Sequence, residues 1–311
     1  MPPTCNVDGQ IVPESEARVS VLDRGFLFGD SAYEVLRTHR GVPFAWPEHF
    51  DRLRRSADGI GLELDLDDEA LLRRIKATVA AAAVDPAYIR IIVTRGVGSR
   101  PNIDVAFAPG PPTWVIMVRE LPERAAAGVR LAVIPRLRND PRALDPAIKS
   151  GNYLNNVLGL AEAKARGATD CLFLNAAGHV TEASTANFYA VLDQRVLTPP
   201  LSAGLLAGTT RRLLQQLCED LGRDFVEREI SRQDLAAATE MFLSSTLRSV
   251  VPVLEVDGRP VGGGQPGPVT DELQHAFATM CDQRTRDLYA PAWDASSGPD
   301  GHPARHPLRT A

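Results

Sequence analysis

The sequence predicts a mixed α and β protein with two domains. Short segments rich in β-branched and aromatic residues alternate with longer segments of helical pattern. Glycine turns at Ala177-Gly178 and Asp257-Gly258 indicate antiparallel hairpins, whereas helices between other strands indicate crossover connections. A chain of 311 residues, 44% of them hydrophobic, can fill the cores of two ordinary domains.

The first part of the chain predicts strands with two helices among them. Strands are expected at residues 6–12, which form a hairpin, and at 32–39, 42–46, 87–94 and 113–118. Helices are expected at about 47–59 and 67–83. The acidic run before the second helix suits its N-terminus, where negative charge is favourable.

The second part predicts a further alternation of helices and strands. Strands are expected at residues 129–135, 171–175, 187–192 and 225–228, with two more within 241–256. Helices are expected at about 153–166, 209–222, 231–238 and 269–289. This pattern favours an α and β domain with both antiparallel and crossover connections.

The expected organisation is linear along the chain. We expect a small N-terminal α/β domain at residues 1–122, a connection at 123–134 and a larger C-terminal domain at 135–289. Residues 290–311 are rich in Pro, Gly, Ser and charge, and this composition is typical of a disordered tail.

Composition and charge exclude several classes of function. The net charge of −5 and the absence of a basic stripe argue against a nucleic-acid partner. No secretory signal and no run of 18 apolar residues are recognisable, so we expect a cytoplasmic protein without a membrane span. The four cysteines lie far apart and lack metal-ligand spacing, so neither disulfides nor a metal site is expected.

Lysine is rare in this sequence and draws attention to one position. Of the 34 basic residues 31 are arginine, and lysine stands only at positions 76, 149 and 164. Lys76 and Lys164 lie in charged helical patterns, whereas Lys149 lies between Ile148 and a Ser-Gly turn just before a helix. A desolvated amine can act as a nucleophile, which an arginine cannot. An ordinary loop lysine is the alternative interpretation.

Two segments after Lys149 carry further candidate groups. Glu182 follows the hairpin turn at 177–178, where a solvent-facing acid would also be ordinary. The loop from Gly204 to Thr210 combines glycines and hydroxyl groups ahead of a helix, as anion-binding loops do. It lacks the Gly-Lys-Ser/Thr of a Walker A motif, and a threonine N-cap would also explain it.

Together these motifs resemble the class IV, fold-type IV pyridoxal-phosphate aminotransferases. The matching segments are DRGFLFGD (23–30), EHFDRL (48–53), IKSGNYL (148–154), VTE (180–182), TPP (198–200), GTTR (208–211) and SST (244–246). The resemblance covers residues 7 to about 289. It implies a small N-terminal α/β domain, a larger C-terminal domain with a pseudo-barrel of strands, and a homodimer or higher homo-oligomer.

The resemblance also implies roles for individual residues. Lys149 would be the catalytic lysine that forms a Schiff base with pyridoxal 5′-phosphate, Glu182 would pair with the pyridine nitrogen, and Tyr153 would lie near the phenolic oxygen. The remaining cofactor-binding residues, which include the phosphate-binding ones, would be Arg52, Thr209, Thr210, Ser245 and Thr246. The implied reaction exchanges an amino group between an amino acid and a 2-oxo acid by a ping-pong Schiff-base mechanism.

Substrate residues follow from the same resemblance, with three branches left open. The branched-chain aminotransferase branch is most similar, with an aliphatic L-amino acid as donor and 2-oxoglutarate as acceptor. The implied substrate-binding residues are Tyr33, Arg37, Tyr88, Arg90, Arg100, Leu247 and Arg248. Tyr33 could instead be a buried structural residue, and Arg37 is expected on the same strand face.

Two departures from the branched-chain pattern support the alternatives. Arg100 matches a carboxylate-binding position of the D-amino acid aminotransferases, although Asn102 stands where those enzymes have histidine, and a surface arginine is also possible. Leu247 and Arg248 replace a small residue and an acid, which leaves aminodeoxychorismate lyase open. A cofactor-binding protein without turnover is the non-enzyme alternative.

Overall fold

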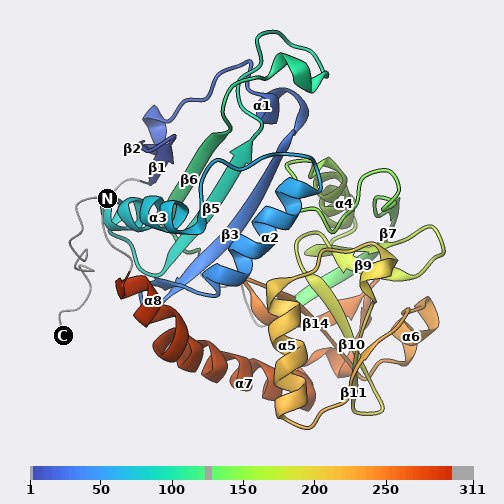
Figure 1. Ribbon diagram of the computed structural model, residues 1–311. Helices are drawn as coiled ribbons and strands as arrows, with labels where there is room; N and C mark the ends of the chain where they lie inside the picture. The colour runs from blue at the N-terminus through green and yellow to red at the C-terminus, as the bar shows by residue number, and fades with distance from the viewer. Residues whose placement is uncertain (1–2, 123–127, 296–311) are drawn as a thin grey trace. The chain divides into compact units, whose positions relative to one another are not determined.

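The computed structural model describes residues 3–122 and 128–295, which form two compact units. The first unit contains residues 3–122, Ile148–Asn152 and 281–295, and the second contains residues 128–147 and Tyr153–Met280. Each unit combines helices and strands, so the predicted mixed fold class is confirmed (Figure 1). The expected division was linear along the chain. In the structure, a short segment around Lys149 and the C-terminal residues belong to the first unit and not to the second.

The first unit is built on a six-stranded sheet with the strand order β2-β1-β6-β5-β3-β4. Its strands are β1 (Thr4–Val7), β2 (Gln10–Pro13), β3 (Ser31–His39), β4 (Val42–Pro43), β5 (Ala87–Thr94) and β6 (Thr113–Glu120). All neighbours pair antiparallel. The expected hairpin at 6–12 and the strands at 32–39, 87–94 and 113–118 are confirmed.

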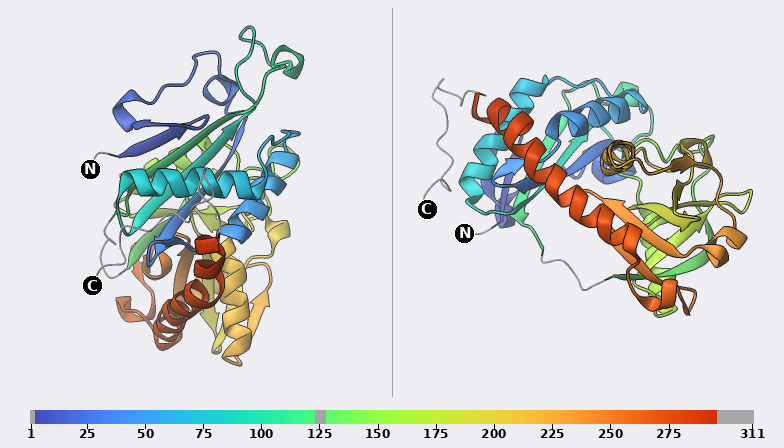
Figure 2. Two further views of the ribbon diagram at one scale, coloured as in Figure 1. Left: turned by 60° about the vertical axis from the view of Figure 1, so that its left-hand side comes forward. Right: turned by 90° about the horizontal axis from the view of Figure 1, so that it is seen from below.

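One face of this sheet is covered by helices. The helices of the unit are α1 (Arg24–Phe28), α2 (Trp46–Asp58), α3 (Asp68–Ala82) and α8 (Ala290–Ala295). Figure 2 shows α3 lying across the strands. Alternate residues of β3 and β5, such as Leu36 and Ile89, have no exposed surface because they face α2 and α3.

The second unit contains strands that close into a ring. Its strands are β7 (Val129–Leu137), β8 (Asp170–Leu174), β9 (Val180–Ala183), β10 (Asn187–Leu192), β11 (Arg195–Thr198), β12 (Phe225–Glu227), β13 (Glu240–Ser245), β14 (Ser249–Val256) and β15 (Arg259–Pro260). The order β10-β13-β14-β7-β8-β9 returns to β10 through the pairing of Asn187 with Glu182. Leu131, Leu172 and Phe188 belong to the core inside it. The predicted pseudo-barrel is confirmed.

Helices lie outside this ring. They are α4 (Leu154–Ala165), α5 (Thr209–Asp220), α6 (Arg232–Ala237) and α7 (Pro268–Arg284). The helix α4 packs on β7 and β8, where Phe173 and Ile134 meet Ala163. The helix α4 lies so close to β8 that a Cβ atom at Gly159 would be only 2.3 Å from the Phe173 ring. All four helices were expected within a few residues.

Several short elements were not predicted from the sequence. The helix α1 has five residues, capped by the Asp23 side chain and ended by Gly29 in the left-handed region. The strands β9 and β11 have four residues each. The expected strand at 42–46 shortens to β4, because Ala45 has a φ of 54° and α2 begins at the next residue.

The expected disordered tail is wrong for residues 290–295. They form α8, which follows a π-helical segment at Thr285–Tyr289. Trp293 is buried, and Lys76 Nζ donates a hydrogen bond of 2.6 Å to the Trp293 carbonyl. The aromatic side chain supplies apolar contact that the polar composition of the segment conceals. Residues 296–311 lie outside the described part of the chain, as do 123–127 of the expected connection.

No helix of residues 3–122 and 128–295 combines the length and the apolar character needed to cross a membrane.

Substituting Trp293 tests the docking of the C-terminal segment. We expect Trp293→Ala to lower the free energy of unfolding by about 3 kcal/mol, because it empties a buried aromatic position. Leu288→Ala on the same segment is the control, since Leu288 is 56% exposed and should change stability by under about 0.5 kcal/mol. Urea denaturation measures the free energy of unfolding of both variants. It is followed by far-ultraviolet circular dichroism, because fluorescence would be affected by the loss of the tryptophan itself. Equal effects of the two variants would contradict the docking.

Candidate functional site

Lys149 is held in the first unit by its own backbone. Its carbonyl accepts a hydrogen bond of 3.0 Å from Tyr33 N–H, and its N–H donates to Ser56 Oγ at 3.1 Å. The neighbouring Ser150 forms a β-bridge with Ala32, so the segment adds to the edge of β3. The Lys149 side chain is only 9% exposed. The structure therefore does not place Lys149 in an ordinary surface loop.

The Tyr33 ring lies against two cations. The Lys149 ammonium is 4.3 Å from the ring centroid and 3.2 Å from the phenolic oxygen. The Arg90 guanidinium carbon is also 4.3 Å from the centroid. Within the described parts of the chain, Arg90 makes no ion pair. A half-buried cation without a carboxylate partner is suited to receive an anionic ligand.

The predicted substrate residues of the first unit share one face of the sheet. In the register of β3 and β5, Arg37 lies opposite Tyr88 and Val35 lies opposite Arg90. Directly opposed residues of an antiparallel pair point to the same face, and Tyr33 is two residues from Val35. Tyr33, Arg37, Tyr88 and Arg90 thus gather on the face away from α2, and Arg37 lies on the face expected for it.

Arg52 is buried against an acid that the sequence reading did not single out. Its Nε donates to Glu34 Oε1 at 2.6 Å and its Nη2 donates to Glu34 Oε2 at 2.8 Å. His49 Nδ1 lies 2.7 Å from the same Oε2. Burial raises the pKa of Glu34, but Arg52 and His49 outweigh it and hold the pKa well below its usual range. Burial lowers the pKa of His49, so its ring is neutral at pH 7.

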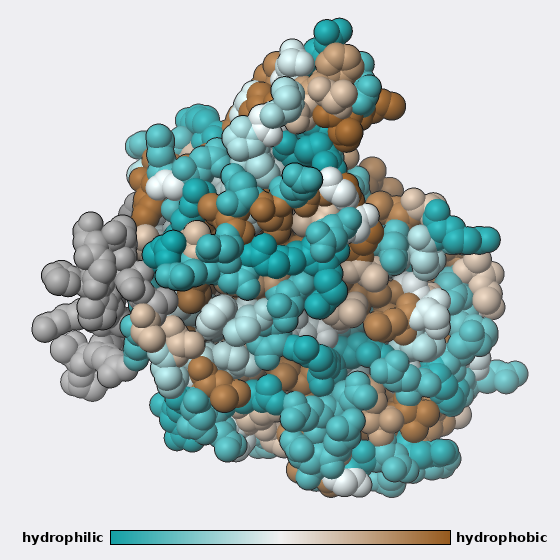
Figure 3. Space-filling view, viewed as in Figure 1, coloured by the Kyte–Doolittle hydropathy of each residue, from teal (hydrophilic) through white to brown (hydrophobic). Residues whose placement is uncertain are grey.

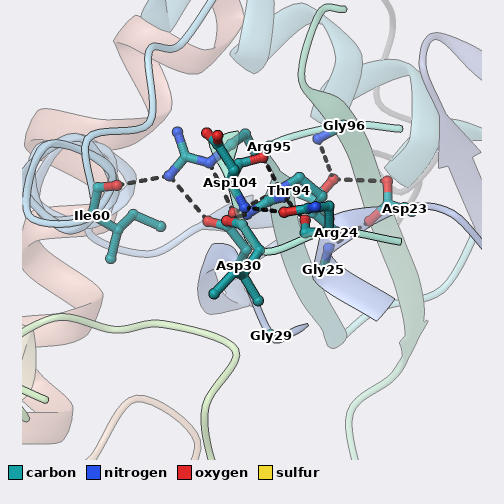
Figure 4. Close-up of polar contacts among 12 residues, drawn as sticks. Asp23, Arg24, Gly25, Gly29, Asp30, Ile60, Thr94, Arg95, Gly96 and Asp104 are labelled. Atoms are coloured by element: carbon teal, nitrogen blue, oxygen red, sulfur yellow. Dashed lines mark hydrogen bonds and ion pairs between the residues drawn. The ribbon is translucent and has the colours of Figure 1, made fainter. Parts of the chain in front are cut away.

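Arg100 lies on the long connection between β5 and β6, which a buried cluster anchors (Figure 4). Arg24 donates to the carbonyls of Asn102 at 2.6 Å and Ile103 at 2.9 Å. Both Arg24 and Arg95 donate to Asp30 Oδ2 at 2.8 Å. Burial raises the pKa of Asp30, but hydrogen bonds from Arg95 and Arg24 hold it below its ordinary value.

The Arg100 guanidinium itself stacks on Phe107, with 4.3 Å between the guanidinium carbon and the ring centroid. Arg100 is exposed, so its charge faces solvent at the surface of the first unit.

In the second unit, Glu182 is a buried and oriented acid. Its Oε1 accepts from Arg138 Nε at 3.0 Å, and its Oε2 accepts from Leu206 N–H at 3.2 Å. The side chains of Glu182 and Arg138 are each 6% exposed, so Glu182 is not the solvent-facing acid of the alternative interpretation. Sequence reasoning missed Arg138, because an arginine after a strand carries no signal of burial. The pair places a carboxylate against a guanidinium in a buried environment, where each charge compensates for the lost hydration of the other.

The loop before α5 ends in a helix N-terminus fitted for an anion. Gly208 is the N-cap, and as a glycine it offers no side chain to cap the helix. A Cβ at Gly208 would lie 2.1 Å from Asn187 Oδ1, so only glycine fits there. Thr209 and Thr210 are buried at the first two helical positions. Backbone N–H groups and the helix dipole favour a phosphate or carboxylate at such an end.

Two buried polar atoms near Glu182 lack protein partners. Ser184 Oγ and Asn156 Oδ1 make no hydrogen bond within residues 3–122 and 128–295. Asn156 Nδ2 donates to the Ser184 carbonyl at 2.7 Å, so the two residues are neighbours. Buried polar atoms are normally satisfied, and an orphaned pair beside an acid indicates a polar ligand or water there.

The remaining predicted residues lie at a turn and at a helix start. Thr246, Leu247 and Arg248 form the turn between β13 and β14, where Arg248 N–H donates to Ser245 Oγ at 3.3 Å. Arg248 Nη1 donates to Asp170 Oδ2 at 2.6 Å, so its charge is neutralised by a buried acid. Tyr153 is the N-cap residue of α4 and is half-buried.

The residues present fit pyridoxal 5′-phosphate. The first unit holds a buried lysine and a buried arginine, and the second holds a buried acid and a helix N-terminus with a glycine N-cap. An amine for an aldehyde, a carboxylate for a pyridinium and donors for a phosphate are the groups that this cofactor needs.

Comparisons with known proteins identify the relatives of this chain. The family described as amino-transferase class IV matches residues 31–256. A Methanocaldococcus jannaschii protein, provisionally named a branched-chain-amino-acid aminotransferase, is 34% identical over 271 residues, covering 87% of this chain and 94% of the relative. The D-alanine aminotransferase of Staphylococcus aureus is 35% identical over 277 residues, covering 87% of this chain and 95% of the relative.

A solved structure extends the similarity to the fold. The branched-chain aminotransferase of the archaeon Thermoproteus uzoniensis, solved with norvaline, has a TM-score of 0.84 and 30% sequence identity. The match covers 93% of this chain and 97% of that one. The family match spans well over half of the sequence, and the chain belongs to the class IV aminotransferases.

Proposed function

We propose that this aminotransferase uses pyridoxal 5′-phosphate to exchange the amino group of an aliphatic L-amino acid with 2-oxoglutarate. Class IV aminotransferases are pyridoxal-phosphate enzymes that act on amino acids and 2-oxo acids. The observation that carries the proposal is the placement of Lys149. Two of the three lysines are buried: Lys76 donates to the Trp293 carbonyl, whereas Lys149 is fixed through its backbone at two points and directed at a tyrosine.

The proposed roles assign each side chain a task. The bound cofactor supplies an aldehyde that combines with amines and a ring that withdraws electrons from the substrate α-carbon. Lys149 Nζ would anchor the aldehyde and, once the substrate amine has released it, would take the proton from the substrate α-carbon and give it to the former aldehyde carbon; the Tyr33 hydroxyl would orient this amine. Glu182, held by Arg138, keeps the ring nitrogen protonated.

Candidate phosphate donors are present in each unit taken separately. In the first unit we propose Arg52, and in the second we propose the α5 N-terminus with Thr209 and Thr210 and the turn residues Ser245 and Thr246. Tyr153 is assigned to the phenolic oxygen of the cofactor. Arg248 is a weaker candidate for substrate than the sequence suggested, because Asp170 already neutralises it.

The sheet face around Tyr33 supports the choice of substrate. It presents Val35 and Ile92 for an aliphatic side chain and Arg90 for the second carboxylate of glutamate or 2-oxoglutarate. The relative solved with norvaline binds an unbranched aliphatic amino acid.

A second candidate is a D-amino acid aminotransferase. It is favoured by the similarity to D-alanine aminotransferases and by the exposed Arg100 on an anchored segment. The lyase reading and the cofactor-binding protein without turnover have no comparable support.

We also propose that the protein acts as a homodimer or a higher homo-oligomer. The first unit exposes large apolar side chains, among them Phe26 at 68% and Ile103 at 79%. Figure 3 shows apolar surface at the tip of the connection between β5 and β6. Apolar surface of this kind on a folded protein commonly marks an interface.

Half-reactions with three substrates separate the branches. We expect L-leucine to convert the aldehyde form of the bound cofactor into its amine form, which the shift in visible absorbance measures. D-alanine should convert it at least about 100-fold more slowly, since handedness decides which face of the α-carbon Lys149 meets. Conversion by D-alanine alone would favour the second candidate, and pyruvate release from aminodeoxychorismate would favour the lyase.

Replacing the lysine tests the proposed chemistry directly. We expect Lys149→Ala to lower kcat by at least about 10⁴-fold, because both the anchor for the aldehyde and the base are lost. Lys164→Ala is the matched control, since this lysine lies exposed on α4 and should leave kcat unchanged. Single-turnover absorbance of the purified, cofactor-loaded variants gives the result. Turnover by Lys149→Ala within tenfold of the wild type would refute the assignment.

Arg90 tests the proposed acceptor. We expect Arg90→Met to raise the KM for 2-oxoglutarate roughly 10- to 100-fold and to leave the KM for an aliphatic 2-oxo acid within about threefold, because only the former has a second carboxylate. Arg119→Met is the control, since Arg119 on the adjacent β6 is bound by Glu14. An equal change of KM for both oxo acids would remove Arg90 from the proposed substrate site.

A further inference from the structure

Glu34 carries a carboxylate at a fully buried position, where removing a charge from water costs much free energy. It lies in the middle of β3 with no exposed surface, between the sheet and α2. An ionised carboxylate in such a place costs several kcal/mol unless it is paired and hydrogen-bonded. A hydrophobic residue would suit this face as well as Leu36 does. The presence of an acid here therefore calls for a reason beyond packing.

Besides a hydrogen bond of 3.2 Å from Val35 N–H on its own strand, the Glu34 carboxylate contacts two side chains of α2. Arg52 donates from Nε and Nη2, one bond to each carboxylate oxygen, at 2.6 and 2.8 Å. His49 approaches Oε2 at 2.7 Å, and its neutral ring donates from Nδ1. A two-point contact with a planar guanidinium fixes both its position and its plane. Glu34 thus determines where Arg52 points.

The same helix face also fixes the lysine segment. Ser56 lies one turn after Arg52 on α2, and its Oγ accepts the hydrogen bond from Lys149 N–H. On the strand side, the residue before Glu34 is Tyr33, whose N–H donates to the Lys149 carbonyl. The strand β3 therefore presents Glu34 to Arg52 on one face of the sheet, and its edge binds the backbone of Lys149.

We propose that Glu34 is a positioning residue that sets the guanidinium of Arg52 for the phosphate of the cofactor, at a fixed separation from Lys149. The proposal rests on the proposed function, in which Arg52 and Lys149 hold opposite ends of pyridoxal 5′-phosphate. A donor that is already oriented loses little freedom on binding, so its contribution to affinity is larger. Glu34 acts through Arg52 and touches neither cofactor nor substrate.

A phosphate-selective binding test separates this role from a purely structural one. Pyridoxal has the same aldehyde and ring as pyridoxal 5′-phosphate but lacks the phosphate. The two dissociation constants, measured by absorbance titration of the cofactor-free full chain, give a ratio that reports the phosphate contribution alone. We expect Glu34→Gln to weaken pyridoxal 5′-phosphate roughly 10- to 100-fold and pyridoxal by less than about threefold.

Companion variants fix the interpretation. Arg52→Lys should show the same selective loss, and the double variant should lose little more than Arg52→Lys alone, because the two residues act as one unit. Glu34→Asp keeps the charge on a shorter side chain and should show a smaller selective loss. Asp68→Asn is the matched control, because it removes the acid partner of Arg54 on the same helix, and the ratio should not change.

Each outcome has one meaning. Parallel weakening of both compounds, or no weakening of either, would overturn the role of Glu34. If Glu34→Gln does not fold, the ratio for Glu34→Asp decides, and an unchanged ratio there would overturn the proposal. Failure of the wild type to bind either compound, or binding that survives Lys149→Ala unchanged, would instead refute the proposed function.

Discussion

The pairing of the Lys149 segment with the edge of β3 is the constraint on which the first unit's chemistry depends. Two backbone hydrogen bonds, from Tyr33 N–H to the Lys149 carbonyl and from Gly151 N–H to the Ser31 carbonyl, together with one bridge hold this segment beside Tyr33, although it lies more than a hundred residues away in sequence. Backbone pairing tolerates little displacement, since a one-residue slip would turn the lysine to the opposite face. The backbone that carries the Lys149 amine is thus positioned by strand geometry.

The arginine bias of the sequence has a structural counterpart in the interior. Arg24, Arg52, Arg138 and Arg211 are each at most 8% exposed. Each directs its planar fork at an acid or at backbone carbonyls: Arg52 at Glu34, Arg138 at Glu182, and Arg24 at the β5–β6 connection. Several fixed donors of this kind cannot be supplied by lysine, whose ammonium is a flexible point charge. These arginines have a structural role, and the chemistry proposed above is assigned to Lys149.

Patterns that depend on local sequence predicted much of the fold and part of the site. The strands β5 and β10 and the helix α5 begin at the expected residues, because alternation and capping are local signals. Lys149 stood out because lysine is rare in this chain and because it lies between Ile148 and a Ser-Gly turn instead of in a charged helical pattern. Glu34, Arg138 and α8 escaped prediction, because their burial is decided by partners distant in sequence.

The closed ring of strands in the second unit affects how readily the protein aggregates in a concentrated solution. Among the residues that the structure describes, each of its six strands has a neighbour on both sides, since β9 returns to β10. An open sheet ends in a row of unpaired N–H and C=O groups that can recruit a strand from another molecule. Closure removes that template from the ring, so an apolar and strand-rich core is protected from edge-to-edge aggregation by topology instead of by surface charge.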